Sequence, residues 1–170
     1  MSREVQALLS AVLPGDSALA ELVRESHTAR ENVSLGSDSE DLQGLHTLLV
    51  RNRGFLERLE ELYSSLTLLK SAKAGELAHA KGVYEDAFAQ VASKRQTVGF
   101  NDFASGKERD ARLHAACTAQ SIQMREAQRA YDTAFMAWDY VRLLVRGAES
   151  TQREVETRIR LSSTLLRIVD

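Results

Sequence analysis

Residues 42–98 read LQGLHTLLVRNRGFLERLEELYSSLTLLKSAKAGELAHAKGVYEDAFAQVASKRQTV and contain no proline. Within this stretch, seam positions recur at alternating steps of four and three, the heptad period of a helix that buries one stripe. The seam comprises Leu45, Leu49, Asn52, Leu56, Leu59, Tyr63, Leu66, Lys70, Lys73, Leu77, Ala80, Tyr84, Ala87 and Val91. A second apolar stripe lies beside it in the first half only: Leu48, Phe55, Leu62 and Leu69. We therefore expect one long helix with a broad apolar face followed by a narrow one.

A second long helix is predicted over 107–170. Residues 99–106 separate it from the first, and their Gly99, Asn101-Asp102 and Gly106 predict a loop. The second seam comprises Leu113, Cys117, Gln120, Met124, Ala127, Tyr131, Ala134, Trp138, Val141, Val145, Ala148, Gln152, Val155, Ile159, Ser162, Leu166 and Val169. A short loop makes the two helices antiparallel neighbours, with residues i and j meeting where i + j is roughly 204.

The predicted hairpin has two unlike halves. Its distal half pairs 70–97 with 108–134, both alanine-rich, and its basal half pairs 42–69 with 135–162. Residues 1–41 predict two shorter helices, about 2–13 and 16–33, separated by Pro14-Gly15 and followed by a polar loop. The fold class is therefore all-α: one long antiparallel helical hairpin, a coiled coil, with two shorter N-terminal helices packing on its base. We expect a single helical domain over 1–170.

The charge of the chain is small but uneven. The net charge is −2, and residues 1–41 hold 3 − 8 = −5 of it, which leaves +3 for the rest. This balance excludes a broadly basic nucleic-acid-binding protein. Cys117 is the only cysteine, so an intramolecular disulfide is impossible and a reducing compartment fits. We expect a cytoplasmic protein without a signal peptide, and no apolar run approaches the roughly 20 residues that span a bilayer.

The residue patterns for catalysis and metal binding are incomplete. Glu76 and His79 form a Glu-x-x-His pair, but a di-iron bundle needs two such pairs with further glutamates. A solvated polar face is the simpler interpretation. Cys117 falls on the seam, where a small buried residue is expected, and no glycine-rich phosphate loop is present. We predict no enzymatic activity, no metal, no cofactor and no small-molecule substrate.

The predicted tip of the hairpin gathers cations and aromatic rings. They are Lys94, Arg95, Phe100, Phe103, Lys107, Arg109 and Arg112. Cations bind phosphates and rings stack on any base, which suits a sequence-tolerant single-strand site. Asp102, Glu108 and Asp110 reduce the excess to 5 − 3 = +2. In the alternative interpretation, the two phenylalanines pack back against the helix ends and fix the turn.

The last helix carries a second set of cations without any lysine. Arg142, Arg146, Arg158 and Arg160 are the candidates for phosphate binding on this helix, because guanidinium groups form forked hydrogen bonds. Glutamates at 149, 154 and 156 are interleaved with them. Such alternation also fits ion pairing along the helix or between subunits.

The narrow distal half predicts self-association. A two-helix arm buries little apolar area by itself. We expect Tyr84, Phe88 and Val91 to be exposed near its seam, where other copies of the chain would cover them. The sequence therefore predicts a homo-oligomer.

Two stretches, KERDARLHAA at 107–116 and AWDYVRLLVRGAESTQREVETRIRL at 137–161, carry a family resemblance. With the long hairpin and the aromatic-Trp entry to the last helix, residues 55–165 resemble the recombination mediator proteins of T4-like phages. The resemblance implies a homo-oligomer that binds single-stranded DNA and helps to load a RecA-type recombinase, through the tip cations and the last-helix arginines. The alternative is a coiled-coil protein-interaction or assembly factor, such as a chaperone, that binds no nucleic acid.

Overall fold

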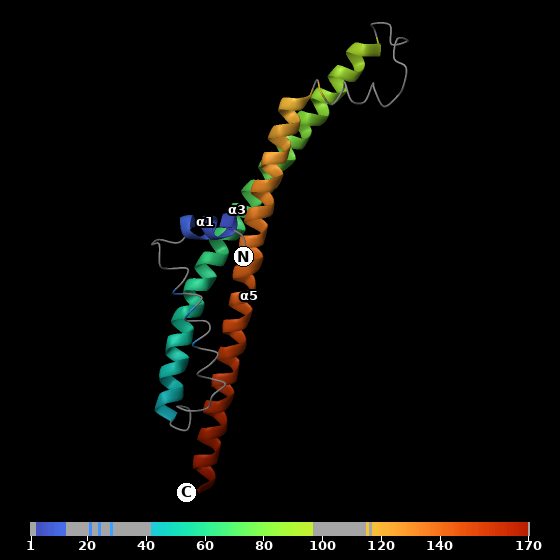
Figure 1. The fold of residues 1–170 in the computed structure, drawn as a ribbon. Coiled ribbons are helices and arrows are strands. Elements are labelled where there is room, and N and C mark those ends of the chain that lie inside the picture. The colour runs from blue at the N-terminus through green and yellow to red at the C-terminus, as the bar shows by residue number, and fades with distance from the viewer. Residues whose placement is uncertain are drawn as a thin grey trace. The chain divides into compact units, whose positions relative to one another are not determined.

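The computed structural model describes residues 3–12, 42–96 and 117–169, together with the single positions 21, 24, 28 and 115. For 94–96 and 165–169 it describes the backbone only. Three helices make up the described segments: α1 (Arg3–Val12), α3 (Leu42–Gln96) and α5 (Thr118–Val169) (Figure 1). The described part of the chain is all-helical, which confirms the predicted class.

Helix α3 buries the stripe that its heptads predict. Every predicted seam position on α3 is buried or half-buried, and so are the four positions of the second stripe. The most deeply covered are Leu45, Leu59 and Leu66. Consecutive members of this set are fourteen and seven residues apart, so all three lie on one side of the helix. The period of the pattern therefore identified the buried face.

Helix α5 follows the same rule. From Cys117 to Ser162, every predicted seam position is buried or half-buried. Val141, Ala148 and Val155 are seven apart and all buried. Leu113, Leu166 and Val169 lie where no side chains are described. Helices α3 and α5 pack together, because each presents an apolar stripe that needs a cover.

The contacts divide the chain into two compact units. Unit 1 comprises Met1–Thr67 with Met136–Asp170, and unit 2 comprises Leu68–Phe135. Each long helix contributes its first part to one unit and its second part to the other. The boundaries fall within two residues of the predicted division between the basal and distal halves.

In unit 1, named contacts set the register between α3 and α5. Leu45 packs with Val155 in one apolar cluster. Asn52 Nδ2 donates a hydrogen bond to the Ala148 carbonyl oxygen at 3.1 Å. Residue numbers therefore rise along α3 as they fall along α5, with 45 + 155 = 200 and 52 + 148 = 200. The Trp138 indole hydrogen bond to Thr67 gives 67 + 138 = 205, so the predicted sum of about 204 lies within the range of these contacts.

Unit 2 buries Leu77, Cys117 and Ala134. Tyr84 and Phe88 lie one turn apart on α3 with ring centroids 6.2 Å apart. The prediction that Tyr84, Phe88 and Val91 are exposed was wrong, because all three are half-buried. Mutual ring contact covers part of the two aromatic side chains, and the Val91 position lies on the seam itself.

The N-terminal segments are described in part. Helix α1 buries Val5 and Leu9, two apolar residues one turn apart on one face. Of the predicted second helix, Glu21, Arg24 and Thr28 are described and are helical. The Thr28 hydroxyl donates to the Arg24 carbonyl oxygen at 2.9 Å, which is the i−4 pattern of a helix. The polar loop at 34–41 lies outside the described residues.

The predicted outer ends of the long helices are tested only in part. Helix α3 is described to Gln96, and positions 97 and 98 of its predicted range lie outside the described residues. Helix α5 begins at Thr118, and Cys117 is in a turn. The Thr118 hydroxyl donates to the Ala115 carbonyl oxygen at 2.7 Å, which satisfies a backbone acceptor just before the helix starts. The predicted loop at 99–106 and the predicted helical start at 107 lie outside the described residues.

Candidate interaction surfaces

An aromatic and guanidinium cluster occupies the α3–α5 contact in unit 1. The Trp138 ring stacks on Tyr63 with centroids 5.6 Å apart and an interplanar angle of 29°. The indole N–H of Trp138 donates to the Thr67 hydroxyl oxygen at 3.1 Å. The Arg142 guanidinium carbon lies 5.0 Å from the Trp138 ring centroid. The heptad pattern placed Trp138 on the seam, but it did not predict the contacts of its ring with Tyr63 and Arg142.

Arg142 is a predicted phosphate-binding residue, and its guanidinium group already contacts residues of its own helix. Besides covering Trp138, its guanidinium donates to Asp139 Oδ1 at 2.5 Å, three residues back on α5. Its Nε is buried and has no hydrogen-bond partner in the described part of the chain. A guanidinium held on a ring and a carboxylate has fewer donors to offer an incoming phosphate.

Arg158 is paired in the same way. Its guanidinium donates to Glu154 Oε1 at 2.8 Å, one turn back on α5. Arg153, at 3.7 Å from Glu149, continues the pattern. These contacts support the predicted alternative of ion pairing along the helix, in which each pair contributes a few tenths of a kcal/mol.

Arg146 and Arg160 differ from the other two candidates on α5. Both side chains are exposed, and no ion pair to either is recorded within the described segments. Their guanidinium groups keep their donors for solvent or for a ligand. Of the four predicted phosphate-binding arginines on α5, these two are the most available.

The tip candidates cannot be placed as a site. Lys94 and Arg95 belong to α3, but only their backbone is described. The remaining members lie outside the described residues: Phe100, Phe103, Lys107, Arg109 and Arg112. The tip site and its structural alternative both stay predictions.

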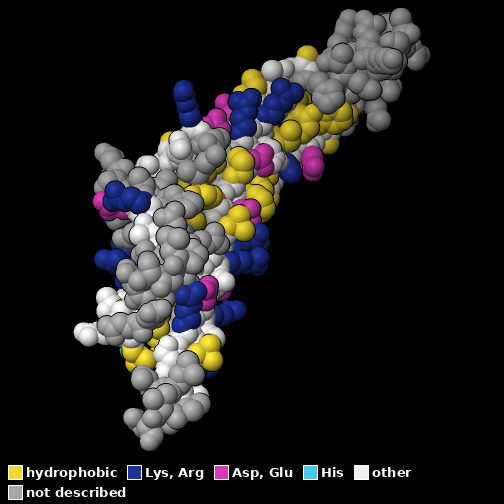
Figure 2. Space-filling view, turned by 60° about the horizontal axis from the view of Figure 1, so that its bottom comes forward, with side chains coloured by type: hydrophobic (Ala, Val, Ile, Leu, Met, Phe, Trp, Pro, Cys, Tyr) yellow, Lys and Arg dark blue, Asp and Glu magenta, His cyan; other side chains and the backbone are white. Residues whose placement is uncertain are grey.

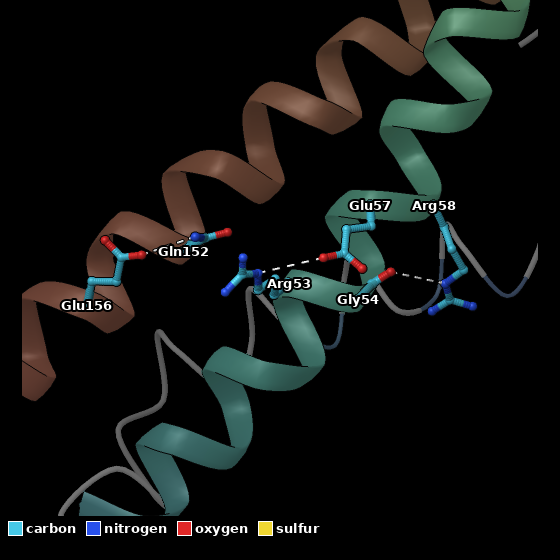
Figure 3. A network of polar contacts seen from close by, with 6 residues as sticks. All are labelled: Arg53, Gly54, Glu57, Arg58, Gln152 and Glu156. Atoms are coloured by element: carbon cyan, nitrogen blue, oxygen red, sulfur yellow. Dashed lines mark hydrogen bonds and ion pairs between the residues drawn. The ribbon is translucent and has the colours of Figure 1, made fainter.

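Charges of both signs are interspersed along the helices. Helix α3 carries 8 − 6 = +2 and helix α5 carries 8 − 6 = +2. On the face seen in Figure 2, basic and acidic side chains lie next to one another. Polar contacts within single helices, drawn in Figure 3, include Arg53–Glu57 at 3.6 Å and Gln152–Glu156 at 3.0 Å. On the face seen in Figure 2, the side chains that the structure describes form no continuous basic field of the kind that tracks a phosphate backbone.

Large apolar side chains remain exposed on the outer sides of the helices. In unit 1, Met136 and Leu143 are 45% and 56% exposed. They are seven residues apart, so they share one face of α5, and that face is not the seam. Val50 is 72% exposed on α3. Paired outward apolar residues on one helical face are a starting point for binding another protein.

The described residues hold no group of three or more His, Cys, Asp or Glu side chains that would suit a metal ion. Glu76, one half of the Glu-x-x-His pair, receives the ammonium group of Lys73 at 2.8 Å. Cys117 is a free, buried cysteine. Among the described helices, none has an apolar stretch long enough to cross a bilayer.

No protein-family model matches the chain. Comparisons with curated proteins and with solved structures likewise returned no match.

Proposed function

We propose that the chain is a non-enzymatic, homo-oligomeric helical hairpin that acts in the cytoplasm by binding other proteins along its outer surface. One observation carries this proposal. Arg142 and Arg158 of α5 are paired to acids three or four residues away, whereas Met136 and Leu143 stand exposed on a single outward face. Removing such side chains from water favours association.

The proposal includes an antiparallel coiled coil as the framework. The contacts Leu45 to Val155 and Asn52 to Ala148 support this arrangement, and so do the seven-residue spacings of the buried positions. In such a coil the seam binds the partner helix and the outward positions stay free for a second chain. The N-terminal helices would cover the base of the hairpin.

Self-association is tested by light scattering of the whole chain and of two variants. We expect the wild type to be a multimer at micromolar concentration. Met136→Lys with Leu143→Lys should lower the mass, because two charges replace the shared apolar face. The matched control is Val50→Lys, since Val50 is exposed on the other helix of the same unit. A monomeric wild type, or equal masses for all three proteins, would contradict the proposal.

The second candidate function is recombination mediation: binding of single-stranded DNA and loading of a RecA-type recombinase. The specific observation in its favour is the pair of exposed side chains Arg146 and Arg160. They are fourteen residues apart on α5, so they share a face and are separated by about 21 Å along the axis. Both could contact phosphates of one extended strand.

A fluorescence-anisotropy titration with a labelled single strand at two salt concentrations tests this candidate. Phosphate binding predicts an affinity that falls steeply as salt rises. Arg146→Glu with Arg160→Glu should weaken binding at least tenfold, or about 1.4 kcal/mol. Arg129→Glu is the control, because Arg129 is exposed on the same helix but belongs to unit 2 and lies off the face of Arg146 and Arg160. Absence of binding at low salt would leave protein interaction as the function.

A further inference from the structure

One polar pair interrupts the apolar contact between α3 and α5 in unit 1. Asn52 is only 3% exposed, and its amide Nδ2 donates to the Ala148 carbonyl oxygen at 3.1 Å. Ala148 is itself buried. A backbone carbonyl inside a helix already accepts from the helix, so this second donor must approach it from the side. The short alanine side chain leaves room for that approach.

The neighbours of this pair are apolar on both sides. Leu45 and Leu59 lie seven residues before and after Asn52 on α3, and both are fully buried. Val141 and Val155 occupy the same places around Ala148 on α5 and are also fully buried. The two helices therefore present matching series, Leu-Asn-Leu against Val-Ala-Val, in opposite directions.

The polar pair is not an optimal contact for stability. The Asn52 Oδ1 atom is buried without a hydrogen-bond partner in the described part of the chain. Gln152, one turn beyond Ala148, turns its amide nitrogen to Glu156 (Figure 3). Its Oε1 is likewise buried and unpartnered. A leucine at 52 would continue the apolar series without stranding an acceptor.

We propose that the Asn52–Ala148 pair fixes the register of α3 against α5. A slip of one heptad would place Asn52 beside Val141 or Val155, whose branched side chains cover the backbone carbonyl. The whole amide would then be buried without a partner, which strongly disfavours the slipped pairing. Apolar residues alone tolerate such a slip, because leucine packs on valine or alanine in any layer. Asn52 thus contributes specificity at the expense of stability.

The register can be measured by the distance between two spin labels. Arg53→Cys and Arg153→Cys place labels at side chains that are 75% and 79% exposed, with Cys117→Ala removing the native thiol. We expect one narrow distance population for this parent protein. Asn52→Leu should add a second population displaced along the axis by about 10 Å, the length of one heptad. Its unfolding midpoint in urea should rise.

Two further variants distinguish the effect of losing the Asn52 amide from a general loosening of the packing between α3 and α5. Leu59→Met conserves volume at the next layer and should keep the single distance. Asn52→Leu combined with Leu59→Asn, Val141→Ala and Ala148→Val moves the polar pair by one heptad and leaves a single alanine for Asn to meet, so it should restore the single distance. If Asn52→Leu does not fold cooperatively, Asn52→Ala takes its place with the same expectation. A single narrow population in the Asn52 variant, or a second population in Leu59→Met, would overturn the proposal.

Discussion

Replacing either ring of the Tyr63–Trp138 stack should destabilise unit 1, and the two losses should not add. The ring centroids lie 5.6 Å apart at 29°, a geometry worth about 0.5–1.5 kcal/mol beyond the buried area. The indole hydrogen bond to Thr67 adds about 1 kcal/mol. The guanidinium of Arg142 over the ring adds about 0.5–1 kcal/mol at a half-exposed position. Trp138→Leu should therefore lower the free energy of unfolding by about 3 kcal/mol.

The coupling energy between the two rings tests the stacking geometry more directly than the loss in either single variant. Tyr63→Leu removes the stack but keeps the indole hydrogen bond, because Thr67 still offers its hydroxyl oxygen. Each single variant loses the stacking energy, and the double variant loses that same energy and no more. A double-mutant cycle should therefore give a coupling energy of about 1 kcal/mol. Urea unfolding followed by far-ultraviolet circular dichroism measures all four proteins, including those that lack tryptophan.

A distant pair serves as the control for this cycle. Val155→Ala perturbs the layer of Leu45, about 27 Å along α3 from Tyr63. Its effect should add to that of Tyr63→Leu within about 0.5 kcal/mol. If the Tyr63–Trp138 cycle is additive within the same range, the two rings contribute only buried area. An additive cycle would thus show that the 5.6 Å stacking geometry adds no stability of its own.

Three further outcomes are expected. A Cβ added at Gly54 or Gly75 meets no atom within 4 Å. Alanine at either position should therefore raise the free energy of unfolding by about 0.5–1 kcal/mol in urea titrations. Destabilisation would show that the site is not open. Buried Cys117 should react with a thiol reagent on the order of 100-fold more slowly in the native protein than in denaturant, and equal rates would contradict its burial. Glu57→Gln should change the free energy of unfolding by less than about 0.5 kcal/mol, because its partner Arg53 is 3.6 Å away and both side chains are mostly exposed. A larger loss would mean that this surface pair is part of a wider network.

The buried faces of both long helices could be predicted from the sequence because a heptad period leaves few alternatives. A residue such as Leu59 or Val141 recurs in phase with its neighbours, and only one side of the helix can bury them all. Lys70 and Lys73 were placed on the seam by period alone, and both are half-buried. Long aliphatic stems allow lysine to lie over an apolar stripe.

The register and the pairing of individual side chains could not be predicted to one residue. Folding about the centre of a loop gives one sum near 204, whereas the individual contacts range from 200 for Asn52 and Ala148 to 205 for Thr67 and Trp138. The difference arises because the register depends on which side chains fit together across the seam, and loop composition says nothing about that. The Trp138 cluster was missed for the same reason, since its partners depend on register and side-chain rotamers.

The arginines illustrate a different limit. Their number and spacing on α5 follow from the sequence. Whether a guanidinium group is available to a ligand depends on the side chains around it. Arg142 is drawn onto a ring and a carboxylate, and Arg158 onto Glu154. Arg146 and Arg160 remain exposed. Sequence spacing identified the possible ion pairs, and side-chain geometry separated the engaged arginines from the available ones.

Trp138 gives the molecule an internal optical label. It is the only tryptophan of the chain, and its ring lies within unit 1 against Tyr63. Tryptophan emission therefore reports the state of unit 1 alone, whereas the far-ultraviolet signal of α3 and α5 is collected from both units. Recording the two signals in one denaturant titration tells whether the units lose structure together or in succession, without attaching any dye.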